Sequence, residues 1–123
     1  MIVEDEAAIS LALEDAFQEA GFKVLGPFSS SASALIKLAH EAPSVAVLDT
    51  ILTDGSCLEL ARELRLRGVP FVVYSGYEED HERAPELRDV PWVRKPALHA
   101  SVVSAARGAL VSSPPLKVRI KIK

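Results

Sequence analysis

The sequence predicts a single α/β domain in which helices cover both faces of a parallel sheet. Short apolar runs and amphipathic segments alternate along the chain, as expected for successive strand–helix units. Each apolar run is continuous, which is typical of strands buried on both faces. The chain has 123 residues, 49% of them hydrophobic, and this suits one domain whose core is large enough to fold without disulfides.

Five strand–helix units are predicted in order along the chain. The fourth helix is the weakest, because residues 78–87 are highly polar and Pro85 would break a helix that runs through them. We expect a short or irregular helix there. The glycines Gly21 and Gly68 are expected to end the helices before them. The predicted strands cover residues 1–4, 22–26, 44–49, 70–75 and 91–96, and the regular helices cover 7–20, the stretch from the serines at 29–31 to Ala39, 56–67 and 98–110.

Polar side chains stand where four of the predicted strands end. They are Glu4 and Asp5 after the first strand, Asp49 after the third, Ser75 after the fourth and Lys95 after the fifth. Because functional groups of such sheets gather at the carboxyl ends of the strands, we expect these side chains to converge.

This combination of side chains indicates phosphoryl chemistry with a hard cation. Carboxylate oxygens from two strands are ligands that Mg²⁺ prefers, together with waters and a phosphate oxygen. A carboxylate can then act as the nucleophile, while a hydroxyl and an ammonium group stabilise the charge on the phosphoryl oxygens. Asp49 is the best candidate nucleophile, since it is the lone acid at the end of a central strand.

Four sequence motifs resemble the receiver domain of two-component response regulators. They are VEDE at the first strand, VLDTILTDG around Asp49, VVYSGY at the fourth strand and WVRKP at the fifth, in order and at suitable spacing over about residues 1–110. The resemblance implies a flavodoxin-like, doubly wound sheet of five parallel strands in the order 2-1-3-4-5. It also implies that Asp49 accepts a phosphoryl group from a histidine kinase or a histidine phosphotransfer protein.

The resemblance assigns roles to the remaining polar positions. Asp5 would bind Mg²⁺ directly, Glu4 directly or through water, and Ile51 through its backbone carbonyl. Ser75 and Lys95 would bind the phosphoryl oxygens.

Two further positions carry expectations from the family. The bond between Lys95 and Pro96 is expected to be cis. Trp92 takes the place of an aromatic residue that, with Ser75, switches conformation on phosphorylation. The domain would catalyse its own phosphorylation and slow dephosphorylation, without being a conventional turnover enzyme.

Charge and composition limit the setting and the partners. Four basic residues fall in the last seven positions, so the rest of the chain is acidic and lacks the basic surface expected for direct nucleic-acid binding. Cys57 is the single cysteine, and no leader or membrane-length apolar run is seen, which favours a cytoplasmic protein without a membrane segment. Residues 111–123 are expected to be a basic tail, either disordered or a cloning remnant. Output would then be contact with a downstream protein, a homodimer or phosphate relay.

Two other functions would use similar residues. An aspartate-dependent phosphatase usually has a second acid two residues after its nucleophile, and Ile51 occupies that position, which argues against it. A pseudo-receiver, meaning a protein-binding module with the same fold and no phosphorylation, stays open as the alternative. Taken one at a time, each polar residue also has a structural explanation, and their joint placement at four strand ends favours a site.

Overall fold

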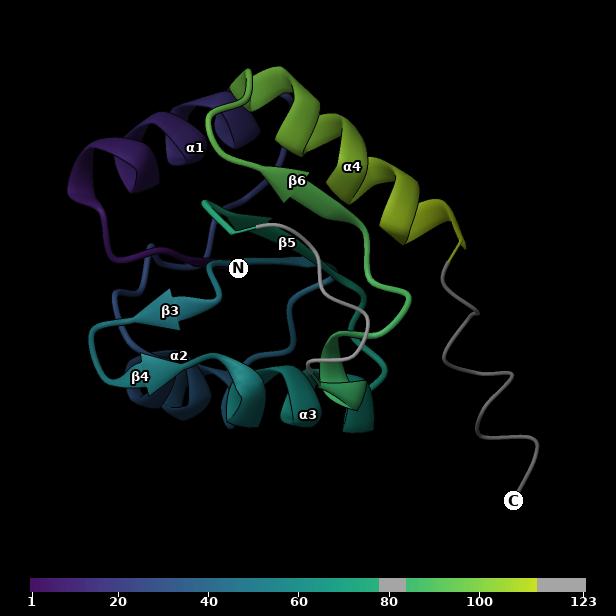
Figure 1. The fold of residues 1–123 in the computed structure, drawn as a ribbon. Helices are drawn as coiled ribbons and strands as arrows, with labels where there is room; N and C mark the ends of the chain where they lie inside the picture. The colour runs from purple at the N-terminus through teal and green to yellow at the C-terminus, as the bar shows by residue number, and fades with distance from the viewer. Residues whose placement is uncertain (78–83, 113–123) are drawn as a thin grey trace.

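The computed structural model describes residues 1–77 and 84–112. A parallel sheet of four strands lies between two pairs of helices (Figure 1): α1 and α4 cover one face, and α2 and α3 cover the other. Part of the predicted fourth helix, residues 78–83, and residues 113–123 of the predicted tail lie outside the described residues. The sheet strands are β1 (Ile2–Val3), β2 (Ala46–Leu48), β5 (Phe71–Ser75) and β6 (Trp92–Arg94), and the helices are α1 (Ala7–Glu19), α2 (Ser31–Leu38), α3 (Leu58–Leu66) and α4 (His99–Ser112).

The predicted α/β class is confirmed, and the strands alternate their side chains between two apolar clusters. Val3, Leu48 and Val73 face α2 and α3, and all three are fully buried. Their neighbours Val47 and Val72 face α1 and α4. Because successive side chains of a strand point to opposite faces, a strand buried on both sides must be apolar throughout. The continuous apolar runs in the sequence have this cause.

The observed strand order is β1-β2-β5-β6, which agrees with four of the five expected positions. The strand predicted over 22–26 is not formed as such. Instead, a segment from Leu25 to Phe28 runs beside β1: the N–H of Ile2 donates to the carbonyl oxygen of Leu25 (3.1 Å), and the N–H of Glu4 donates to that of Phe28 (2.8 Å). Only one isolated bridge, between Val3 and Phe28, results. Gly26 has a φ of +99° and Pro27 lacks an N–H, so a regular ladder cannot continue through them.

A short antiparallel hairpin of β3 (Ile51–Leu52) and β4 (Gly55–Ser56) follows Asp49 and was not expected from the sequence. It is tied to the start of α2. The N–H and the hydroxyl of Thr53 both donate to the carbonyl oxygen of Ser29, at 3.2 and 2.9 Å. The carboxylate of Asp54 accepts from the backbone N–H groups of Ser31 (2.9 Å) and Ala32 (3.0 Å), which caps the helix.

The irregular fourth helix is represented in the described residues by a single 3₁₀ turn, η1 (Pro85–Leu87), with Pro85 at its first position. The side chain of Arg65 on α3 holds this turn by donating to the carbonyl oxygens of Glu86 (2.7 Å) and Arg88. None of the described helices is long and apolar enough to cross a membrane.

Candidate phosphoryl-acceptor site

The polar residues predicted from the strand ends lie together at one edge of the sheet. Glu4 follows β1, Asp49 follows β2, Ser75 ends β5 and Lys95 follows β6. Parallel strands bring their carboxyl ends to the same edge, so the fold itself produces this meeting. A hollow of about 260 Å³ opens there, and its lining includes Asp5, Asp49 and Lys95.

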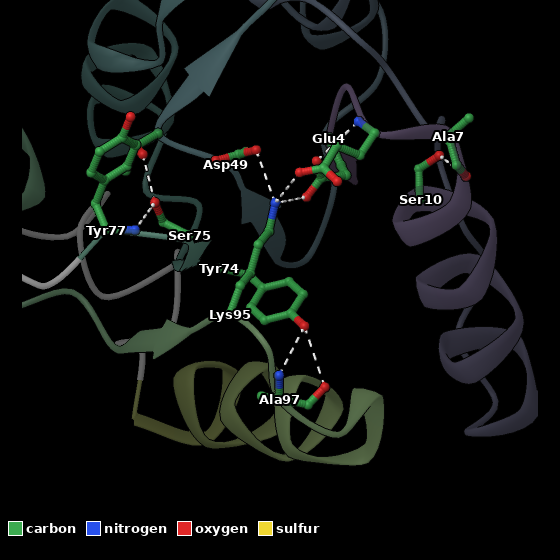
Figure 2. Close-up of polar contacts among 11 residues, drawn as sticks. Glu4, Ala7, Ser10, Asp49, Tyr74, Ser75, Tyr77, Lys95 and Ala97 are labelled. Atoms are coloured by element: carbon green, nitrogen blue, oxygen red, sulfur yellow. Dashed lines mark hydrogen bonds and ion pairs between the residues drawn. The ribbon is translucent and has the colours of Figure 1, made fainter.

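The ammonium group of Lys95 lies among carboxylates (Figure 2). Its Nζ is 2.7 Å from an oxygen of Glu4 and 3.1 Å from an oxygen of Asp49. These two carboxylates are 3% and 8% exposed, whereas Glu6, at 3.6 Å from the same Nζ, is largely exposed. Buried ions of opposite charge depend on each other far more than exposed ones. The contacts of Lys95 with Glu4 and Asp49 therefore stabilise its charge more than the contact with Glu6 does.

Burial and hydrogen bonds shift the pKa values of Glu4 and Lys95. Burial raises the pKa of Glu4 to about 7, although hydrogen bonds from Lys95 and from the N–H of Glu6 act in the opposite direction. Burial also pulls the pKa of Lys95 down, but its hydrogen bonds to Glu4 and Asp49 outweigh this, and the pKa of Lys95 is raised. The lysine is therefore a firmly charged group in the middle of the site.

The donor set fits a divalent cation. One carboxylate oxygen each from Glu4, Asp5 and Asp49 lie within 4.8 Å of one another. Mg²⁺ prefers oxygen ligands and keeps several waters, and the hollow beside Asp5 and Asp49 has room for them. The half-exposed side chain of Ile51 lines the same hollow.

Ser75 reaches the same edge, but its hydroxyl is turned to other partners. Its Oγ lies 2.7 Å from the Oγ1 of Thr50 and accepts a hydrogen bond from the N–H of Tyr77 at 3.2 Å. Ser75 is fully buried. In Figure 2 its side chain points toward Tyr77 and away from the ammonium group of Lys95.

Contacts around Lys95 hold its backbone in place. The N–H of Lys95 donates to the carbonyl oxygen of Ser75 at 2.7 Å. The hydroxyl of Tyr74 lies 3.3 Å from both the N and the O of Ala97, and the Lys95–Pro96 bond is cis, as expected. Lys95 Nζ also lies 5.5 Å from the centre of the Tyr74 ring, a cation–π distance.

Trp92, the predicted switch residue, is partly buried against the core on the side of α2 and α3. Its Nε1–H donates to the carbonyl oxygen of Tyr77 at 2.9 Å. Trp92 is thereby connected to the backbone two residues beyond Ser75.

Sequence reasoning missed two contributors to this site, Thr50 and Tyr77, and assigned no role to a third, Glu6. Thr50 directly follows Asp49, but nothing in an apolar strand pattern indicates that its hydroxyl reaches β5. Tyr77 contributes through its backbone, which carries no sequence signal. Glu6 belongs to the acidic run at the start of the chain, and that run is the one signal that pointed to it.

A family model of the response regulator receiver domain matches residues 1–107. The chain belongs to this family. It is thus a receiver domain of two-component signalling, a class of domain that interacts with histidine kinases or phosphotransfer proteins and generally binds Mg²⁺ at an acidic pocket.

Individual proteins agree with this assignment. The chain is 33% identical over 88 residues to the KDP operon transcriptional regulatory protein KdpE of Escherichia coli (strain K12), a match that covers 71% of this chain and 39% of KdpE. It therefore spans well under half the length of that relative. The solution structure of SdrG from Sphingomonas melonis Fr1 is similar with a TM-score of 0.73 and 31% identity, covering 89% of this receiver domain and 92% of SdrG. The receiver domain of Erythrobacter litoralis PhyR shares the fold, with a TM-score of 0.81, 24% identity and coverage of 93% and 92%.

Proposed function

We propose that this receiver domain takes a phosphoryl group from a phosphohistidine onto a carboxylate oxygen of Asp49, with Mg²⁺ bound by Glu4, Asp5, Asp49 and the backbone carbonyl of Ile51. The observation that carries the proposal is the position of the Asp49 carboxylate, 3.1 Å from the ammonium group of Lys95 and within 4.8 Å of two further carboxylates. Such an arrangement combines a nucleophile with cationic charge next to it.

The transfer needs one bond to form and one to break. An oxygen of Asp49 attacks phosphorus, and the bond between phosphorus and the histidine nitrogen breaks, leaving the electron pair on the imidazole. Hydrolysis later adds water at phosphorus and returns the carboxylate with release of inorganic phosphate. Mg²⁺, when bound, supplies positive charge that reduces repulsion between the carboxylate and the phosphoryl oxygens.

Lys95 and Ser75 act on the transferred group. Lys95 is charged and lies beside Asp49, so its ammonium group stabilises the negative phosphoryl oxygens as they arrive. Ser75 donates its hydroxyl hydrogen to one of these oxygens once it turns away from its present partners. Trp92 follows this movement, because its indole nitrogen bonds to the backbone of Tyr77.

The output is a changed protein-binding surface beside β5 and β6, read by a downstream protein or by a second copy of the domain. We assign the function to residues 1–110 and no part of it to the basic tail over 111–123. The setting is the cytoplasm, with a histidine kinase or a histidine phosphotransfer protein as donor. The match of the family model over residues 1–107 supports this boundary.

Intact-mass measurement tests the transfer. After incubation with acetyl phosphate and Mg²⁺, the wild-type protein should gain one phosphoryl group, and Asp49→Asn or added EDTA should prevent this. Asp15→Asn is the matched control, since Asp15 is an exposed acid on α1, and it should be modified like the wild type. An unchanged wild-type mass in protein whose circular dichroism shows an intact fold would support the pseudo-receiver instead.

Fluorescence tests the switch, because Trp92 is the only tryptophan. Binding of beryllofluoride, a phosphoryl mimic, should change the emission of the wild-type protein, and Ser75→Ala should reduce that change. A constant emission despite binding demonstrated by ¹⁹F NMR would remove Trp92 from the mechanism.

A further inference from the structure

The hydroxyl of Ser75 makes hydrogen bonds to two neighbours, Thr50 and Tyr77. It is 2.7 Å from the Thr50 hydroxyl, with one of the two donating, and it accepts from the N–H of Tyr77 at 3.2 Å. Among the described residues, neither partner belongs to the group of charges around Lys95. Ser75 is thus held in an orientation that does not serve Asp49.

We expect Thr50 to stay in place if Ser75 turns. Thr50 is 6% exposed, and its backbone is fixed because its carbonyl oxygen accepts from the N–H of Cys57 at 3.1 Å, at the start of α3. Within the described residues no buried side-chain nitrogen or oxygen lacks a hydrogen-bond partner. When Ser75 donates to a phosphoryl oxygen, the buried Thr50 hydroxyl loses its partner, and this is unfavourable.

We infer that Thr50 is a positioning residue that holds Ser75 in the resting orientation and so weakens the capture of a phosphoryl group at Asp49. This inference rests on the proposed function. The hydroxyl of Thr50 competes with the phosphoryl oxygen for the same hydrogen-bonding group. Removal of the Thr50 hydroxyl should therefore favour the bound state.

The test compares the affinity for beryllofluoride in the presence of Mg²⁺, followed by ¹⁹F NMR, among wild type and variants. Thr50→Val has nearly the same shape without the hydroxyl, and should bind about two- to tenfold more tightly, the factor that corresponds to the net contribution of one hydrogen bond. Thr50→Ser keeps the hydroxyl and should stay within about twofold of wild type. In a Ser75→Ala background, Thr50→Val should have no effect, because the competing group is gone.

The results separate this inference from the proposed function. Binding by the wild type, with no gain in a folded Thr50→Val variant, would overturn the role of Thr50 and leave the proposed function standing. A gain that persists in the Ser75→Ala background would overturn it as well, since a general structural effect would then be responsible. Binding by Thr50→Val alone would support it, whereas absence of binding in both proteins would contradict both proposals.

Discussion

Replacing Lys95 by methionine should lower the free energy of unfolding by about 3 to 5 kcal/mol in metal-free buffer near pH 8, the cost of leaving buried charges without their partner. The expected loss is this large because Lys95 pairs with buried carboxylates. Two carboxylates that are less than a tenth exposed, Glu4 and Asp49, lie 2.7 and 3.1 Å from Lys95 Nζ. The exposed Glu6 adds little, because an ion pair in contact with water contributes at most about 1 kcal/mol.

Urea unfolding in EDTA measures this loss, and Lys23→Met provides the control. Lys23 is an exposed lysine, so the same chemical change there should alter the free energy of unfolding by less than about 0.5 kcal/mol. Adding Mg²⁺ at about ten times its dissociation constant should return about 1.4 kcal/mol to Lys95→Met, because the cation binds the folded state only. If the Lys95 and Lys23 variants unfold at the same urea concentration with equal slopes, the carboxylates do not depend on Lys95 and the reasoning fails.

Three further perturbations test the packing around the site. Burial raises the pKa of the Cys57 thiol to about 11, so iodoacetamide should alkylate the folded protein slowly. The alkylation rate should rise about tenfold per pH unit between about pH 8 and 10 as the thiolate forms. An alkylation rate equal to that of the unfolded chain would refute this. Leu64→Ala should lower the free energy of unfolding by about 2 to 5 kcal/mol, because Leu64 is 0% exposed. Leu66→Ala on the same helix should lower it by less than about 0.5 kcal/mol, because Leu66 is 76% exposed. Equal losses in urea unfolding would be inconsistent with this packing. Gly26→Ala should lower the free energy of unfolding by about 2 kcal/mol or more, because Gly26 has a φ of +99° and an added Cβ would lie 2.9 Å from a carbonyl oxygen of β1. Gly76→Ala is the control and should be tolerated in the same assay, because a Cβ there meets nothing within 4 Å.

Much of the fold was predictable, because burial on both faces leaves a strong apolar signal in β2 and β5. The segment at 22–26 was not, since its apolar residues resemble a strand while Gly26 and Pro27 interrupt the ladder beside β1. The hairpin after Asp49 was also missed. Its four strand residues are too few to show any periodicity.

The candidate site was predictable as a set of positions and not as a set of contacts. A strand end predicts where Asp49 and Lys95 lie, and the order of parallel strands predicts that they meet. The direction of a hydroxyl group depends on local competition between neighbours, as Ser75 illustrates with Thr50. That competition involves the tertiary structure, so no pattern in the chain reports it.

The two sides of the site differ in how they are tied to neighbouring elements. On one side, Thr53 and Asp54 each make two hydrogen bonds to the first turn of α2 or to the residues just before it, so the hairpin and that helix form one unit. On the other side, Ser75, whose hydroxyl is bound to Thr50, ends the strand that pairs with the strand carrying Trp92. If Asp49 is phosphorylated as proposed, we expect the structural change to spread toward β5 and β6, and we expect a protein that docks against α2 to meet a surface that changes little.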